Sequence, residues 1–156
     1  MNKQHNIEWR ALTFSQLSTN ELFDIMKLRV DVFVVEQNCP YPELDAKDKL
    51  ATTVHLAGYI EGELALYTRL LDRNVSYDGC YSIGRVIVAP LWRQARLGDV
   101  LMQKSIHEIG HRLGSGPIQI GAQHHLHKFY QKHGFVQCSE VYDEDGIEHI
   151  DMIKTT

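Results

Sequence analysis

The sequence contains few of the residues that would place it in a specialised class. Its three cysteines, at positions 39, 80 and 138, are odd in number and include no CxxC pair, so they predict neither a disulfide framework nor a thiolate metal site. No segment approaches the ~18 consecutive apolar residues of a membrane span, and the first residues lack the apolar core of a signal peptide. We therefore expect a cytoplasmic protein with no membrane partner.

A large excess of charge of one sign is also missing. Sixteen Lys and Arg residues against 20 Asp and Glu residues give a formal charge of −4, which argues against broad electrostatic attraction to nucleic acid. The 156 residues are 44% hydrophobic and 23% charged, typical of one globular domain. We expect a single domain over residues 1–156 and leave open whether it forms a homodimer.

Apolar periodicity and turn residues predict strands and helices in an irregular alternation. A capping box of Ser18 and Glu21 starts the first expected helix. The expected helices are 19–35, 98–113 and 124–133, and the expected strands are 7–12, 55–60, 64–71, 81–89, 118–122, 135–142 and 147–153. This order predicts an α/β fold with a mixed sheet covered by helices, rather than a doubly wound parallel sheet.

Residues 107–111 read HEIGH, a match to the HExxH motif of zinc hydrolases. In that motif two histidines on one helix face bind zinc and the glutamate acts as general base. The longer protease pattern requires a third histidine where this chain has Pro117, and the apolar residues Met102 and Ile109 occupy the expected buried face of the helix. We predict no metal and keep a zinc-dependent hydrolase as the less favoured alternative.

A second motif lies between the strand that ends at Val88 and the helix that starts near Gly98. The first turn of a helix presents unpaired N–H groups and the positive end of the dipole, so it can bind phosphate. Arg93 and Arg96 add positive charge to this loop. From the residues alone, an anion site and an ordinary connection with two solvated arginines remain equally open.

The spacing VxVxPxxRxxRxG from Val86 to Gly98 resembles LxVxPxxRxxGxG, the acetyl-CoA signature of the GNAT superfamily of N-acetyltransferases, with Arg96 in place of the first glycine. The segment from Gln123 through Tyr130 to Phe135 is similar to the motif that follows it in the superfamily. FVVEQNCPY at 33–41, together with 83–88, 121–123 and 140–150, resembles the ElaA branch over nearly the whole chain.

This resemblance implies a GNAT acyl-CoA N-acyltransferase fold, a mixed and mostly antiparallel sheet flanked by helices. It implies direct transfer of an acetyl group from acetyl-CoA to an unidentified amine acceptor, with Tyr130 as general acid for the CoA thiolate. The pantetheine arm would pair with the backbone of Val86, Ile87 and Val88. The other implied cofactor residues are Arg93, Gln94, Ala95, Arg96, Leu97, Gly98, Asp99 and Gln123.

The reaction also requires a base for the acceptor amine. Glu36, at the end of the first helix, is our first choice, with His149 and His55 as alternatives. A noncatalytic module that binds or senses acyl-CoA remains the alternative function.

Arg85 is an unexpected charge on a central strand of Val and Ile residues. It either pairs with a carboxylate such as Asp45 or Asp48 or orients the acceptor. We assign Arg85, Asp45 and His149 to the acceptor site. The acidic residues Glu36, Glu43, Asp45 and Asp48 further lead us to expect a cationic amine.

Overall fold

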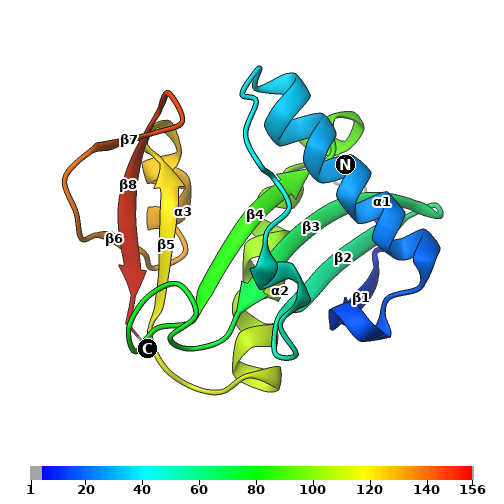
Figure 1. Ribbon diagram of the computed structural model, residues 1–156, viewed down its shortest axis with the longest axis horizontal. Coiled ribbons are helices and arrows are strands. Elements are labelled where there is room, and N and C mark those ends of the chain that lie inside the picture. The colour runs from blue at the N-terminus through cyan, green and yellow to red at the C-terminus, as the bar shows by residue number, and fades with distance from the viewer. Residues whose placement is uncertain (1–4, 156) are drawn as a thin grey trace.

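The computed structural model describes residues 5–155, which form two antiparallel sheets with helices on their faces (Figure 1). The first sheet has the order β1-β2-β3-β4, with strands Glu8–Leu12, Val54–Ile60, Glu63–Leu71 and Ser82–Val88. The second has the order β5-β8-β6, with β7 paired to β8, and its strands are Ile118–Gln123, Ile147–Lys154, Val136–Gln137 and Tyr142–Glu144. The mixed α/β fold with mostly antiparallel pairing is thereby confirmed.

The helices follow the expected order. They are α1 (Thr19–Val30), α2 (Leu97–Arg112) and α3 (His127–Gln131), with short 3-10 turns at 14–16, 46–49, 90–95 and 124–126. The predicted capping box starts α1, because Ser18 Oγ accepts from Glu21 N at 3.0 Å and Glu21 Oε1 accepts from Ser18 N at 2.9 Å. Among the helices of residues 5–155, none has both the length and the apolar character needed to cross a membrane.

The two sheets meet at only one end of their neighbouring strands. A single parallel bridge joins Tyr81 to Ile118, with Tyr81 N donating to Pro117 O at 3.0 Å and Gln119 N donating to Tyr81 O at 2.9 Å. Beyond this bridge β4 and β5 diverge, and Figure 1 shows the second sheet turned away from the first. The last residues of β4 therefore have a neighbouring strand, β3, on one side only.

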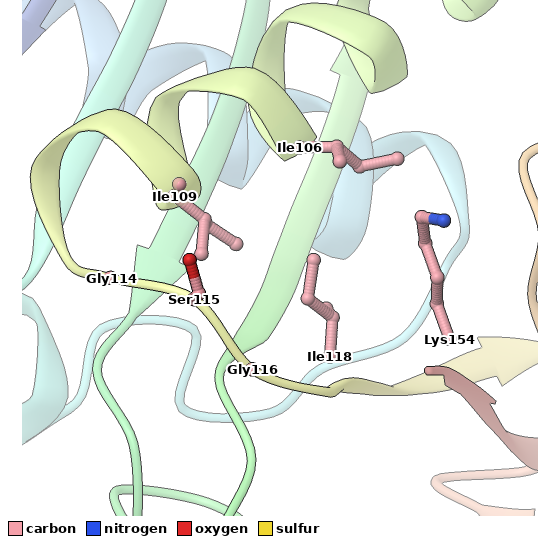
Figure 2. A pocket seen from close by; sticks show the side chains of 8 residues that line it. Ile106, Ile109, Gly114, Ser115, Gly116, Ile118 and Lys154 are labelled. Atoms are coloured by element: carbon pink, nitrogen blue, oxygen red, sulfur yellow. The ribbon is translucent and has the colours of Figure 1, made fainter. Parts of the chain in front are cut away.

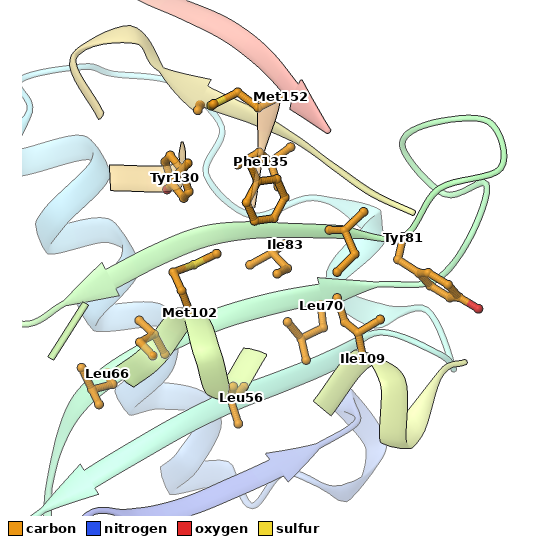
Figure 3. Packing of buried hydrophobic residues seen from close by; sticks show 14 of the residues in the cluster. Leu56, Leu66, Leu70, Tyr81, Ile83, Met102, Ile109, Tyr130, Phe135 and Met152 are labelled. Atoms are coloured by element: carbon orange, nitrogen blue, oxygen red, sulfur yellow. The ribbon is translucent and has the colours of Figure 1, made fainter. Parts of the chain in front are cut away.

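One hydrophobic core links both sheets on the face covered by α2 and α3. Figure 3 shows Met102 of α2 and Tyr130 of α3 between residues of β3 and β4 and Met152 of β8. The opposite face of the first sheet is covered by α1, whose Ile25 packs near Tyr67 and Ile87. The side chain of Ile87 thus belongs to the face under α1, and those of Val86 and Val88 to the main core.

Three segments differ from the sequence prediction. The first helix continues past Val30 as a π-helix over Asp31–Glu36, with Gln37 N bonding Val32 O at 3.2 Å, until the prolines at 40 and 42 stop it. The third helix starts as a 3-10 turn, so its α-helical part is only 127–131.

The expected strand 135–142 is also divided, into β6 and β7. Cys138 N still donates to Asp151 O at 2.9 Å, but Ser139 Oγ accepts the Asp151 backbone N–H at 2.8 Å. A side chain thus replaces one bond of this pair, and the regular pairing resumes only where β7 begins at Tyr142. The final hairpin is therefore β7–β8, closed by Asp145 and Gly146 with φ of 51° and 84°. Two consecutive positive φ values are typical of the tight turns that join antiparallel strands.

Candidate functional site at the open edge of β4

The end of β4 presents backbone groups that no strand pairs. Tyr67 lies opposite Ile87 and Leu66 opposite Val88, while Ala89 N donates to Ala65 O at 2.8 Å. Because hydrogen-bonded and non-bonded pairs alternate along antiparallel strands, Ile87 is bonded to β3 and Val88 points its N–H and C=O to the open edge. Of the expected pantetheine-pairing residues, Ile87 is therefore already engaged in the first sheet.

This edge leads directly into an uncapped helix N-terminus. The N–H groups of Leu97, Gly98 and Asp99, in the first turn of α2, have no acceptor within the helix. Among residues 5–155 no side chain caps this helix start. Arg96, which stands at the glycine position of the signature, adopts left-handed φ and ψ of 57° and 32°. The turn thus requires the conformation that glycine favours, although an arginine supplies it at a cost of ~1–2 kcal/mol.

Packing between α2 and α3 depends on Gly98. A Cβ atom at Gly98 would lie 3.3 Å from the ring of Phe129, so a larger residue would press on α3. Asp99 fastens the same two helices from the other side, because it pairs with His133 Nε2 at 2.9 Å and with Lys132. The hydrogen bond from Lys132 and that from His133 hold the pKa of Asp99 below its usual value. The first turn of α2 and the helix that carries Tyr130 are therefore positioned together.

The two loop arginines have different surroundings. Arg96 is exposed and forms no ion pair with the described residues, whereas Arg93 is held on both sides. Its Nε donates to Val88 O at 3.0 Å, and its Nη2 donates to Glu36 Oε2 at 2.7 Å. This hydrogen bond from Arg93 lowers the pKa of Glu36. Glu36, the first-choice base, thus lies at the open edge of β4 but is neutralised by Arg93.

Tyr130 is buried, with 6% of its surface exposed, and packs against Phe129 and Phe135 at ring-centroid distances of 5.0 and 6.1 Å. Its hydroxyl forms no hydrogen bond with the described residues. The hydroxyl oxygen keeps some contact with solvent, since it is not one of the fully buried polar atoms that lack a partner. Burial raises the pKa of this phenol to about 12. The group is protonated at neutral pH and has a proton free to donate.

A buried network of alternating charges lies under α1 and the loop that follows it. Arg29 Nε bonds Glu43 at 2.6 Å and its Nη1 bonds Asp48 at 2.6 Å. Arg69 Nη1 bonds Asp48 at 2.9 Å and Asp45 at 2.8 Å. Burial would raise the pKa of Asp48, but the hydrogen bonds from Arg29 and Arg69 outweigh it and lower that pKa to about 2.

Arg85 joins the same network through Glu43, which it contacts at 2.8 Å. The sequence left two alternatives for Arg85, an ion pair with a carboxylate or a role in orienting the acceptor, and the structure contains an ion pair. Its partner is Glu43, and Asp45 Oδ2 lies 3.7 Å from Arg85 Nη2. Each acidic residue that was expected to attract a cationic amine is thus already bound to arginine. The basis for expecting a cationic acceptor is removed.

Sequence reasoning missed two members of this network, Arg29 and Arg69. Arg29 falls on the apolar stripe of the first helix, four residues after Ile25 and four before Phe33, and Arg69 interrupts the buried strand β3. A charge at a position that the pattern assigns to the core was the available signal, because such a charge must have a partner.

The two alternative base candidates are both occupied. His55 is fully buried, with Nδ1 2.7 Å from the Tyr67 hydroxyl and Nε2 3.0 Å from Asp48 O, and burial lowers its pKa. His149 Nδ1 bonds Ile147 O at 2.8 Å, and its Nε2 lies 3.2 Å from Glu144. His149 also faces Gln123 across the β5–β8 pair, and Gln123 Nε2 contacts Gln37 Oε1 at 3.4 Å. His149 and Gln123 thus lie at the β5 side of the split.

The HEIGH segment lacks the arrangement of a zinc hydrolase. His107 and His111 are exposed on α2, but Glu108 is buried and bound by Lys104 and Arg112. Burial opposes the effect of these cations on Glu108, whose pKa is nonetheless lowered. Within residues 5–155 no three His, Cys, Asp or Glu side chains gather as a metal site. Glu108 is therefore unavailable as a base beside the two histidines.

Two pockets lie away from the open edge. One, of about 260 Å³, is shown in Figure 2 between Ile106 and Ile109 of α2, the Gly114–Gly116 turn and Lys154 of β8. The other, of about 460 Å³, lies between α1 and the 44–49 segment and has Asp45 in its wall. Among the residues that the sequence assigned to the cofactor, to catalysis or to the acceptor, only Asp45 of the acceptor set lines either of these two pockets.

A split between two strands that are joined in parallel at one end, leading to a helix N-terminus, is the arrangement of the acyl-CoA N-acyltransferase fold. Comparison with known proteins agrees, because the family described as "Acetyltransferase (GNAT) domain" matches residues 29–156. The chain therefore belongs to the GNAT acetyltransferase family.

Within the family the chain is similar to ElaA. Protein ElaA of Escherichia coli strain K12 is 42% identical over 148 residues, which are 95% of this chain and 96% of that protein. The crystal structure of Escherichia coli ElaA has a TM-score of 0.88 at 41% identity and covers 96% of this chain and 99% of its own. An acyl-CoA N-acyltransferase from Pseudomonas aeruginosa has a TM-score of 0.91 at 38% identity and covers 96% and 100%.

Proposed function

We propose that residues 1–156 form one N-acetyltransferase domain that moves an acetyl group from acetyl-CoA directly to an amine. The observation that carries this proposal is the open edge at Val88, which the chain follows with the uncapped start of α2. The unbonded hydroxyl of Tyr130, on the helix that packs against α2 at Gly98, adds a group able to donate a proton. The proposal is supported by membership of the GNAT acetyltransferase family and by similarity to an acyl-CoA N-acyltransferase of Pseudomonas aeruginosa.

The donor would lie along β4. The pantetheine arm would pair with the outward N–H and C=O of Val88, and the pyrophosphate would accept from the first amides of α2 with Arg96 beside it. The Arg93 side chain occupies part of this edge, because it bonds both Val88 O and Glu36. These hydrogen bonds must break wherever the donor binds in place of Arg93. Pre-arranged amides of this kind stabilise charge without reorganising during the reaction.

The chemistry then needs one acid and one base. The amine nitrogen attacks the thioester carbonyl carbon, the C–S bond breaks, and the thiolate takes the phenolic proton of Tyr130. The amine proton passes to Glu36, directly or through water. When the pyrophosphate attracts Arg93, the hydrogen bond that lowers the pKa of Glu36 weakens, so donor binding makes Glu36 a stronger base.

The test is release of free CoA thiol from acetyl-CoA in the presence of a panel of amines, with mass spectrometry of the acylated product. The proposal predicts thiol release that depends on the amine and continues in the presence of a metal chelator. Binding of acetyl-CoA without thiol release would instead establish a noncatalytic module. Chelator-sensitive peptide hydrolysis would establish the zinc hydrolase.

A further inference from the structure

Arg85 occupies an irregular point of β4 beside the proposed acyl site. The β3–β4 register shifts between Tyr67 and Arg69, where one residue of β3, Thr68, stands against two of β4, Arg85 and Val86. Arg85 lies in this bulge with φ of 51°, a conformation that is strained for any residue except glycine. Backbone strain at Arg85, beside the proposed acyl site, indicates that its side chain has a role that it could not perform from a regular strand position.

The guanidinium of Arg85 is held along one side only. Its Nε contacts both Glu43 oxygens, at 2.8 and 3.0 Å, and its Nη2 donates to Glu43 O at 3.1 Å. Its Nη1 has no hydrogen-bond partner among the described residues and is not one of their sealed polar atoms. The side chain is 22% exposed, whereas that of Glu43 behind it is 2% exposed. Arg85 therefore presents a fixed donor outward.

The carboxylates around Arg85 already have cationic partners among the described residues, so none of them is free to bind a cationic substrate group. Glu43 is shared by Arg29, Arg85 and the hydroxyl of Tyr41. Asp48 is bound by Arg29 and Arg69, and the partly exposed Asp45 takes Arg69 and the backbone N–H of Lys47. On the β5 side of the split, Glu144 pairs with His149. The positive charges of the three arginines of this network balance the negative charges of its three carboxylates. The Nη1 group of Arg85, which has no partner among the described residues, is a cationic donor and therefore favours an anionic group.

On this geometry, and resting on the proposed function, we propose that the acceptor amine carries its own carboxylate, which Arg85 Nη1 binds, with Glu43 as the positioning residue for that arginine. A strand rises by about 3.3 Å per residue, so Arg85 lies within about 10 Å of Val88. This spacing suits small amino acids, in which the carboxylate is a few bonds from the reacting nitrogen. It does not require a long polyamine or an amino sugar.

The test compares each amino acid with its amide, which has the same chain length and a neutral carboxamide in place of the carboxylate, at equal concentrations of the unprotonated amine. Glycine, β-alanine and γ-aminobutyrate are assayed against their amides with acetyl-CoA, by thiol release and product mass. We expect kcat/KM for the best acid to exceed that of its amide by about 10- to 100-fold, as for one charge-assisted hydrogen bond. Equal or better turnover of the amides overturns the inference while leaving the proposed function intact.

Variants sharpen the same comparison. Arg85→Gln should raise KM for the acid more than it lowers kcat and should reduce the acid-to-amide ratio to about one, whereas Arg85→Lys should keep part of it. Arg10→Gln, which removes an exposed arginine of β1 paired only with Glu21, is the matched control and should keep the ratio. An unchanged ratio in a folded Arg85→Gln protein overturns the inference. Absence of thiol release with these acids and amides, together with release in the presence of another amine, overturns the inference and leaves the proposed function intact; absence with every amine of the panel overturns both.

Discussion

The left-handed turn at Arg96 makes an unusually clear prediction, because stability and donor binding should change in opposite directions. Arg96→Gly removes the clash of a Cβ atom at φ 57°, worth ~1–2 kcal/mol, and adds ~0.5–1 kcal/mol of chain entropy to the unfolded state. The net gain in the free energy of unfolding is about 0.5–1 kcal/mol, or a melting temperature about 2 °C higher.

The same substitution removes the exposed charge beside the proposed pyrophosphate site. Loss of one solvent-exposed charge-assisted bond should weaken binding of CoA about three- to tenfold. Arg96→Ala is the matched variant, because it removes the charge but keeps the strained Cβ atom. It should lose the same affinity without the gain in stability.

Chemical denaturation and calorimetric titration with CoA would measure both effects. The reasoning about the turn is refuted if Arg96→Gly is no more stable than Arg96→Ala. The assignment of Arg96 to the phosphates is refuted if neither variant binds CoA more weakly than the original protein.

Three further predictions concern groups of the site and the network. Tyr130→Phe should lower kcat about 100-fold or more, with unchanged CoA affinity and melting temperature, since only an unbonded hydroxyl is lost; steady-state kinetics with calorimetry checks this. Glu36→Gln should lower kcat similarly without weakening CoA binding, because Arg93 is freed; unchanged kcat would limit Glu36 to pairing with Arg93. The pKa of Asp48 is about 2 when folded and near 3.8 otherwise, so its carboxylate stabilises the fold above pH 4 by about 2 kcal/mol, and this is lost as the pH falls toward 2. Urea titrations across that range should show a loss that is about 2 kcal/mol larger in the original protein than in Asp48→Asn, because other carboxylates with a lowered pKa, such as Asp99 and Glu36, titrate in both proteins.

Much of the fold was predictable from local patterns. The apolar periods located α2, β2, β3 and β4 to within one or two residues, because these elements bury a continuous face. The capping box located the start of α1, since its two hydrogen bonds involve neighbouring residues only.

The features that the sequence did not predict depend on distant partners or on backbone conformation. The separation of β4 from β5 leaves no mark in the apolar pattern of either strand. At the bulge, the side chain of Arg85 is held by Glu43 from a distant loop, and at the break after β6 Ser139 bonds Asp151, twelve residues away. The neutralised carboxylates required knowledge of Arg29 and Arg69, which the pattern placed among core residues.

Amide hydrogen exchange with and without CoA tests the central claim, that the open edge of β4 and the start of α2 bind the donor. We predict slower deuterium uptake on CoA binding in peptides that contain Val88 and residues 97–99, because these N–H groups acquire acceptors. Peptides of β1 should be unaffected. Unchanged uptake at Val88 and 97–99, or slowing confined to the pocket beside Ile106 and Lys154, would contradict it.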